Sequence, residues 1–188
     1  MLNWLGDCTF ADLRLPLALT TVDLNSSRVV VLREGKVVDA VRATIALPGI
    51  FSPAERDEQL LVDGGLLDNL PADVVREGGA DVVIAVDVAT DFSSVFPSIQ
   101  GLHSRRHVPE RLMGTVEVLY RSLGVMMAEI HRRRLAEAHP EIVIQPPIPP
   151  GVTVLTGFRR AAEVISAGEE ATISELPHIR ELLATARP

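Results

Sequence analysis

Residues 59–71 of this chain read QLLVDGGLLDNLP, and this stretch decides how the fold is interpreted. The apolar run at 59–62 predicts a short strand that ends at Asp63. Gly64 and Gly65 follow, and glycines permit backbone angles and close approaches that other residues do not. A carboxylate presented in this way can serve as a general base, a nucleophile or a metal ligand. Because Asp-Gly is also a common turn dipeptide, the tripeptide alone leaves a plain solvated turn open.

The segments on both sides of this stretch carry a more specific pattern. Residues 41–53 read VRATIALPGIFSP, and residues 69–75 read NLPADVV. Together they resemble the patatin-like phospholipase family, of the bacterial type related to neuropathy target esterase. In that family a helix of small residues ends in a Pro-Gly-x-Phe-x-Pro-like turn, followed by Asp-Gly-Gly or Asp-Gly-Ala, then Asn-x-Pro and a helix. The resemblance covers roughly residues 7 to 90 well and is only general from 91 to 188.

The resemblance implies an α/β fold, a three-layer α/β/α sandwich with a Ser-Asp dyad. It assigns Asp63 as the dyad aspartate that accepts the serine proton, Gly64 and Gly65 as the loop that presents it, and Asn69 as a residue that fixes the loop by hydrogen bonds. The family's serine lies in a Gly-x-Ser-x-Gly turn, and no serine in this chain has glycine two residues away on both sides. The family's glycine-rich oxyanion segment is absent too. We therefore expect residues 1–188 to be the carboxyl-terminal portion of one domain, without the nucleophile-bearing part.

The function implied by the resemblance is serine-dependent hydrolysis of lipid acyl esters, as in a phospholipase, lysophospholipase or esterase. The substrates would be phospholipids, lysophospholipids or simple acyl esters, and no cofactor is expected. Because it has a base and no nucleophile, this chain alone is expected to be inactive. One alternative is a non-catalytic remnant or pseudoenzyme that binds lipid or a partner protein. Another is a metal-dependent hydrolase that uses Asp81, Asp87 and Asp91 at the ends of a strand.

Composition narrows the classes of partner. The chain has 188 residues, 47% hydrophobic and 4% aromatic, which suits one aliphatic core. Its net charge of −7 argues against nucleic acid as a partner, because phosphate binding needs a basic face. The single cysteine permits no intrachain disulfide, and no apolar run is long enough for a transmembrane helix. We expect a cytoplasmic protein that can contact the inner membrane surface peripherally.

Hydrophobic periodicity and turn residues predict alternating strands and helices. The strongest strand signal is residues 81–88, a continuous apolar run typical of a central strand covered on both faces. Residues 91–110 are polar and irregular, which suits a surface segment or lid. Strands are expected at 17–22, 28–32, 60–62, 81–88 and 142–145, and helices at 37–47, 71–77, about 109–138, 157–168 and 176–184.

The long predicted helix carries two further patterns. One basic cluster comprises Arg105, Arg106, His107 and Arg111. A second, at 131–134, lies near the carboxyl end of the helix, where cations either complement the helix dipole or contact anionic lipid headgroups. An apolar face packs in the core or lines an acyl groove; it comprises Leu112, Met113, Leu119, Leu123, Met126 and Met127. None of the five histidines has metal-ligand spacing, so surface or helix-end roles are expected for them.

Overall fold

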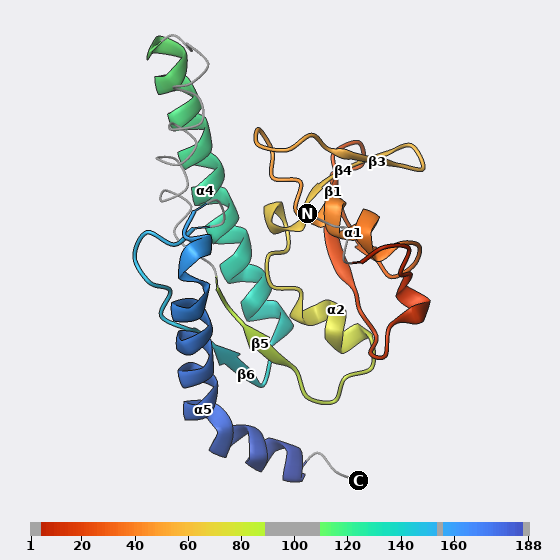
Figure 1. The fold of residues 1–188 in the computed structure, drawn as a ribbon, viewed down its shortest axis with the longest axis vertical. Helices are drawn as coiled ribbons and strands as arrows, with labels where there is room; N and C mark the ends of the chain where they lie inside the picture. Colours follow the sequence, from red (N-terminus) through yellow and green to blue (C-terminus); the bar gives the residue numbers. More distant parts are fainter. Residues whose placement is uncertain (1–4, 89–109, 154–155, 186–188) are drawn as a thin grey trace.

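The computed structural model describes residues 5–88, 110–153 and 156–185. Its amino-terminal half is built on a four-stranded antiparallel sheet of order β2-β1-β4-β3 (Figure 1). The register places Thr21 of β1 opposite Asp63, the last residue of β4. The strands are β1 (Leu19–Asp23), β2 (Arg28–Leu32), β3 (Ala54–Arg56) and β4 (Gln59–Asp63).

The core of this half lies between the sheet and helix α1 (Val37–Thr44). Ala40 and Ala43, one turn apart on α1, are both 2% exposed and pack with Leu32 and Leu61 from the sheet. The small alanine side chains let the helix approach the strands closely. A short 3-10 helix, η1 (Phe10–Asp12), brings Phe10 against this cluster.

The chain leaves β4 through a 3-10 turn, η2 (Gly64–Leu66), and enters helix α2 (Ala72–Glu77). Pro71 lies immediately before this helix rather than at its first position, and Gly78 follows its last residue. The predicted strand at 60–62 and helix at 71–77 are therefore confirmed with small changes in their bounds. Strand β3 was not predicted, because three residues around a tight turn give little periodicity.

Strand β5 (Ile84–Val86) differs from its prediction. It pairs in parallel only with β6 (Ile142–Ile144) among the described residues, in a sheet of two strands. Its side chains alternate, with Ala85 5% exposed whereas Ile84 and Val86 are 41% and 47% exposed. The prediction of a central strand covered on both faces is thus wrong for the described part of the chain. The apolar run favours burial on both faces, but the described residues leave one face of the strand exposed.

Two long helices lie beside the β5–β6 pair (Figure 1). Helix α4 (Glu110–Ala138) confirms the predicted long helix and contacts α2, and helix α5 (Ala161–Thr185) contacts β6. The sequence predicted two separate helices in this region. The structure has one helix instead: α5 follows a 3-10 turn, η5 (Phe158–Arg160), and continues through Pro177. Proline removes one helical hydrogen bond, and α5 changes direction in its last part (Figure 1). The predicted irregular segment at 91–110 lies almost entirely outside the described residues.

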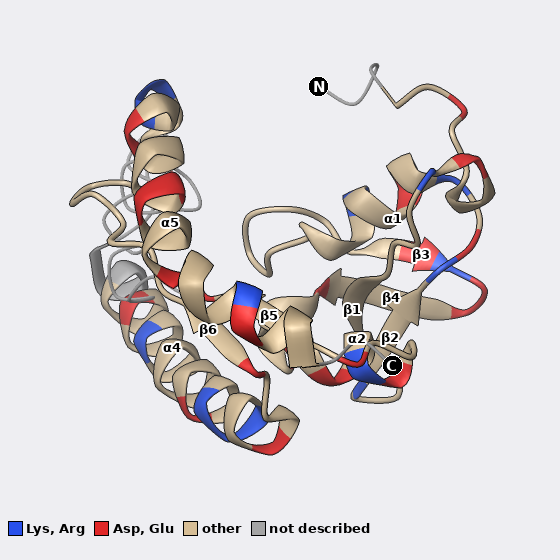
Figure 2. Ribbon diagram, turned by 90° about the horizontal axis from the view of Figure 1, so that it is seen from below, with Lys and Arg blue, Asp and Glu red and all other residues tan. Residues whose placement is uncertain are grey.

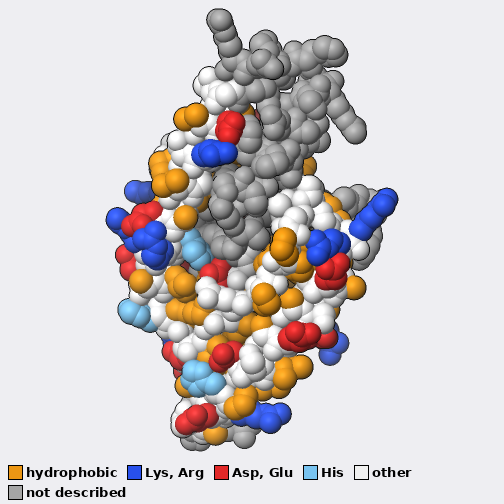
Figure 3. All heavy atoms as spheres, turned by 90° about the vertical axis from the view of Figure 1, so that its left-hand side faces the viewer, with side chains coloured by type: hydrophobic (Ala, Val, Ile, Leu, Met, Phe, Trp, Pro, Cys, Tyr) orange, Lys and Arg blue, Asp and Glu red, His pale blue; other side chains and the backbone are white. Residues whose placement is uncertain are grey.

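The fold is a mixed α/β arrangement, so the predicted fold class is confirmed at that level. The strands form two sheets rather than one. Figure 3 shows hydrophobic side chains on the face where α4 and α5 lie. Exposed apolar residues on these two helices include Val118, Leu119, Val125, Met126, Ile165 and Ile173.

Candidate active-site loop

Asp63 stands at the end of β4, where the strand passes into the glycine turn. Its N–H donates to the carbonyl oxygen of Ala46 (3.1 Å), and its Oδ1 accepts the N–H of Gly65 (2.8 Å). The residue is half-buried. Burial raises the pKa of Asp63, and the hydrogen bond from Gly65 opposes this effect in part. Among described residues the other carboxylate oxygen has no hydrogen-bond donor, so Asp63 retains one oxygen for a further partner.

Gly64 is required by a close approach of two backbones. A Cβ at this position would overlap the carbonyl group of Thr20 on β1. That carbonyl oxygen also accepts the hydroxyl of Thr44 at 2.6 Å, so it is held from the other side by α1. The loop therefore lies directly on the sheet, as the glycines in the sequence predicted.

Gly65 and Asn69 lie against each other next to the carboxylate. A Cβ on Gly65 would be 3.0 Å from Asp63 Oδ1 and 3.0 Å from Asn69 Oδ1. The Asn69 side chain is exposed and forms no hydrogen bond with the part of the chain that the structure describes. The structure thus brings Asp63, Gly64, Gly65 and Asn69 together, while the hydrogen bonds expected from Asn69 are not seen.

Asp68 is the residue of this loop that sequence reasoning missed. Its side chain is 1% exposed, and neither carboxylate oxygen accepts a hydrogen bond within the described chain. The nearest cation is Arg134 of α4, with Nη1 at 3.9 Å from Asp68 Oδ2. Burial and the neighbouring Asp73 raise the pKa of Asp68 to about 6, against the opposing effect of Arg134 and His131. No local pattern marked Asp68, because its burial comes from a helix far along the chain.

Helix α4 presents a polar face to this loop and to β5. Arg134 donates to Asp73 of α2 at 2.8 Å. His131, one turn earlier on α4, has Nε2 at 3.2 Å from Asp87 Oδ2, which also accepts from Gln145 (3.0 Å). His131 is only 16% exposed, so the expected surface role is wrong for this histidine. Its three-residue spacing from Arg134 was a signal that both share one helix face.

The basic cluster at 131–134 is divided between two environments. Arg132 and Arg133 are 72% and 73% exposed and pair with Glu129, whereas His131 and Arg134 face acidic partners on other elements. The last turn of α4 contains no basic residue, so the helix-dipole explanation is not supported. Figure 2 shows acidic and basic positions interleaved along α4. Arg105, Arg106 and His107 lie outside the described residues, as does the side chain of Arg111.

Two of the three strand-end aspartates lie in the described part of the chain. Asp81 is exposed, Asp87 faces His131, and Asp91 lies outside the described chain. Among the residues that the structure describes, no group of three or more His, Cys, Asp or Glu side chains is placed to hold a metal ion.

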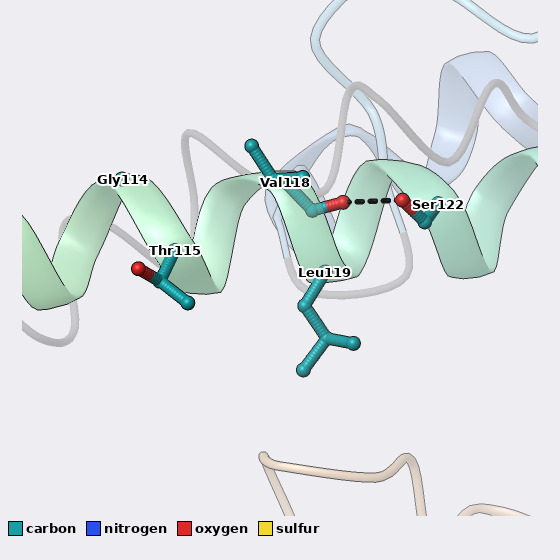
Figure 4. A pocket seen from close by; sticks show the side chains of 5 residues that line it. All are labelled: Gly114, Thr115, Val118, Leu119 and Ser122. Carbon is teal, nitrogen blue, oxygen red and sulfur yellow. Dashed lines mark hydrogen bonds between the residues drawn. The ribbon is translucent and has the colours of Figure 1, made fainter.

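The amino-terminal half of α4 carries a shallow hollow of about 590 Å³ (Figure 4). Val118 and Leu119 supply most of its apolar lining. Next to them, Tyr120 is buried and its hydroxyl donates to the carbonyl oxygen of Pro48 at 2.5 Å. The hollow is lined by Gly114, Thr115, Val118, Leu119 and Ser122. Among the described side chains of the predicted apolar face, Leu119 alone lines it.

Fold and loop together define a mixed α/β protein that presents a half-buried aspartate on a glycine turn, a site suited to general-base chemistry. Residues 3–76 match the family model of patatin-like phospholipases. The predicted resemblance to this family is thereby confirmed for this segment of the chain.

Named relatives agree with the family match. The chain is 39% identical over 105 residues to mouse patatin-like phospholipase domain-containing protein 7, covering 53% of this chain and 8% of that protein. It is 40% identical over 101 residues to human patatin-like phospholipase domain-containing protein 6, covering 50% of this chain and 7% of the relative. An uncharacterised NTE family protein of Mycobacterium tuberculosis is 44% identical over 72 residues, covering 38% of this chain and 12% of that protein. The matched part thus spans a small share of each relative. No helix in the described chain is long and apolar enough to cross a membrane.

Proposed function

We propose that Asp63 is the general base of a serine-dependent lipid acyl hydrolase whose serine lies in polypeptide outside these 188 residues. One observation carries this proposal: a half-buried carboxylate with an available oxygen stands on the glycine loop of a segment related to patatin-like phospholipases. Its raised pKa makes Asp63 a stronger base than an ordinary aspartate. The role extends to Gly64, which lets the loop lie on β1, and to Gly65 and Asn69, which lie beside the carboxylate.

In the proposed reaction the serine hydroxyl donates to the free oxygen of Asp63. Asp63 takes this proton as the serine oxygen attacks the ester carbonyl, and an acyl-serine bond forms while the alcohol leaves with the proton. A water molecule then gives its proton to Asp63 and attacks the acyl group, which releases the fatty acid and restores the serine. Gly65 N–H holds Oδ1 throughout, so the proton moves at the other oxygen. No cofactor takes part in this scheme.

One feature supports an incomplete domain, a three-layer α/β/α sandwich of which residues 1–188 form the carboxyl-terminal portion. Parallel strands are normally covered on both faces, yet β5 exposes Ile84 and Val86. Further polypeptide that pairs with β5 and covers this surface would complete the site.

The substrates we propose are phospholipids, lysophospholipids or simple acyl esters. The hollow on α4 offers the apolar side chains of Val118 and Leu119 to an acyl chain. Among the described residues, Arg132 and Arg133 are the exposed cations at 131–134, and both are paired with Glu129. Peripheral contact of a cytoplasmic protein with an anionic membrane surface would therefore have to compete with these ion pairs. Nucleic acid is not a proposed partner.

The test uses the native gene product, after its intact mass has shown whether it exceeds 20.4 kDa. If it does, Asp63→Asn is expected to lower kcat for a lysophospholipid or p-nitrophenyl ester about 10²–10⁴-fold, the usual contribution of a general base. Asp81→Asn is the matched control, since Asp81 is an exposed aspartate at a strand entry. A fluorophosphonate should label the wild type. An unchanged kcat in Asp63→Asn would refute the dyad assignment.

A non-catalytic role is the second candidate, and the lack of a Gly-x-Ser-x-Gly turn in the chain favours it. If the native mass is about 20.4 kDa, hydrolysis by this mechanism would need a partner chain. The chain would then bind lipid or a partner protein without turnover. Binding to phospholipid vesicles with no release of fatty acid would support this candidate.

A further inference from the structure

The loop that carries Asp63 is closed by Asp68. The backbone N–H of Asp68 donates to the carbonyl oxygen of Gly64 at 2.8 Å. The backbone carbonyl of Asp68 accepts the hydroxyl of Thr20 at 3.4 Å, on the same β1 residue whose carbonyl excludes a side chain at position 64. Residues 64–68 thus form one turn that lies against Thr20 of β1 at Gly64 and is hydrogen-bonded to it at Asp68. Asp68 therefore helps to hold the turn that contains Gly65, whose N–H donates to the Asp63 carboxylate.

The side chain of Asp68 is a buried carboxylate that accepts no hydrogen bond from the described part of the chain. It is 1% exposed, and the titratable groups facing it are Asp73 from α2 and both His131 and Arg134 from α4. Arg134 Nη1 lies 3.9 Å from Asp68 Oδ2 and 2.8 Å from Asp73 Oδ2, so it lies between two carboxylates. Removing one partner from such a buried group leaves an uncompensated charge, which is strongly destabilising.

We propose that Arg134 is a positioning residue: from α4 it neutralises the buried Asp68 and so keeps the 64–68 turn, and with it Asp63, in place on the sheet. Because it concerns the placement of Asp63, this role rests on the proposed function for its catalytic meaning. The effect of Arg134 on the 64–68 turn itself does not depend on catalysis. A residue of α4 is separated from the Asp63 loop by more than sixty positions of sequence, yet it is the only arginine that contacts Asp68 in the described chain.

The same helix offers a matched control. Arg133 is the neighbouring residue on α4, is 73% exposed and pairs only with Glu129 among the described residues. Arg133→Met and Arg134→Met remove the same charge and keep a similar side-chain length. Only the second leaves Asp68 without its cation. Arg134→Lys keeps the charge, and Asp68→Asn removes the need for it.

The experiment measures amide hydrogen exchange, resolved to single residues by mass spectrometry, in the native gene product at pH 7. Gly65 and Asp68 report on the turn, and Leu24, whose N–H donates to Leu60 O at 2.9 Å, reports on the far end of β1. In Arg134→Met we expect the protection factors of Gly65 and Asp68 to fall at least tenfold and that of Leu24 less than threefold. Arg133→Met should leave all three within threefold of wild type, and Arg134→Lys should restore most of the loss.

The charge dependence separates positioning from general packing. Protonation of Asp68 should replace the missing cation, so in Arg134→Met the protection of the turn should recover as the pH falls from 7 to 5. The double variant Asp68→Asn with Arg134→Met should keep protection within threefold of Asp68→Asn alone. Equal loss at Gly65, Asp68 and Leu24, or no rescue by low pH or by Asp68→Asn, would overturn the proposal. If Arg134→Met does not fold, the double variant Asp68→Asn with Arg134→Met decides: a folded double variant supports the proposal, and a double variant that is also unfolded overturns it.

Failure of this proposal and failure of the proposed function are distinguishable. The exchange data need no nucleophile and no substrate, so they test the role of Arg134 even if Asp63 is not a base. In a native product with esterase activity, Arg134→Met should lower kcat at least tenfold with little change in KM, because a displaced base affects the chemical step. Loss of protection without loss of kcat would leave Arg134 as the anchor of the turn but refute its role in placing a catalytic Asp63.

Discussion

At the scale of single residues, Gly64 shows why the loop needs glycine. Its backbone does not require left-handed angles; the constraint is the carbonyl of Thr20, which leaves no room for a Cβ. A backbone obstacle cannot rotate away as a side chain can. The glycine pair was visible in the sequence, whereas the obstacle that explains it became visible only when β1 was placed beside β4.

Gly64→Ala should therefore destabilise the chain. We expect its free energy of unfolding to fall by about 1–3 kcal/mol, the usual cost of forcing extra atoms into a packed site. Urea denaturation followed by circular dichroism measures this change. Gly114→Ala is the control, because Gly114 lies in α4 with open space around it; it should be neutral or stabilising by up to about 1 kcal/mol. Equal effects at both positions would contradict this account.

Asp68 should make stability depend on pH in an unusual direction. Because its pKa is raised to about 6, the folded state binds the proton more tightly than the unfolded chain, and the free energy of unfolding should fall as pH rises from about 4 to about 6. Above that range, burial of the ionised Asp68 carboxylate lowers the free energy of unfolding by its full amount, about 3 kcal/mol. The raised pKa of Asp63 acts in the same direction.

Asp68→Asn should remove most of this dependence. We expect the variant to be more stable than wild type at pH 7 by about 1–3 kcal/mol, with a flatter stability profile between pH 4 and 6. Urea titrations at several pH values check both statements. Identical slopes in the two proteins would show that Asp68 is not the group responsible.

At the scale of elements, α4 holds the Asp63 region from two directions. Arg134 contacts Asp68 after the aspartate, and Tyr120 contacts the turn before it by donating to Pro48 O. Ala46, two residues before Pro48, accepts the N–H of Asp63. A Cβ on Gly49, which has a positive φ of 78°, would overlap the Tyr120 hydroxyl. The helix thus packs against both segments that flank Asp63.

Tyr120→Phe should loosen the 46–50 turn. Loss of this hydrogen bond is expected to cost about 1–1.5 kcal/mol in unfolding free energy, with faster amide exchange at Phe51 and Asp63. Ser122→Ala, on the exposed side of α4, should change stability by less than about 0.5 kcal/mol. Thermal or urea unfolding compares the two. A smaller loss in Tyr120→Phe than in Ser122→Ala would argue against a bracing role for the tyrosine.

Helices and strands were predicted correctly from the sequence where a single local pattern was enough to identify them. Strands β1 and β2, helix α1 and helix α4 appear close to their predicted bounds because periodicity and turn residues are local signals. Strand β5 is shorter and less covered than predicted, because the apolar run records a preference for burial and not the presence of a neighbour. Helix α5 runs without interruption through residues 169–175, where the sequence predicted a gap between two helices, and it includes Pro177.

At the scale of the whole molecule, apolar side chains are exposed on three of the described elements. They include Ile84 and Val86 on β5, Val118 and Met126 on α4, and Ile165 on α5. We expect the isolated chain to bind a hydrophobic dye such as ANS and to self-associate. Size-exclusion chromatography with light scattering checks the second statement. A dye-negative compact monomer would contradict the incomplete-domain proposal.

The sequence by itself determined the family resemblance, the mixed α/β class and the loop that carries Asp63, because each is written in contiguous residues. The tertiary structure alone decided that Asp68 is buried, that Arg134 and His131 face acidic partners from other elements, and that β5 exposes one face. These features depend on which distant elements meet. Periodicity and turn chemistry describe neighbours along the chain, whereas burial and charge pairing depend on neighbours in space.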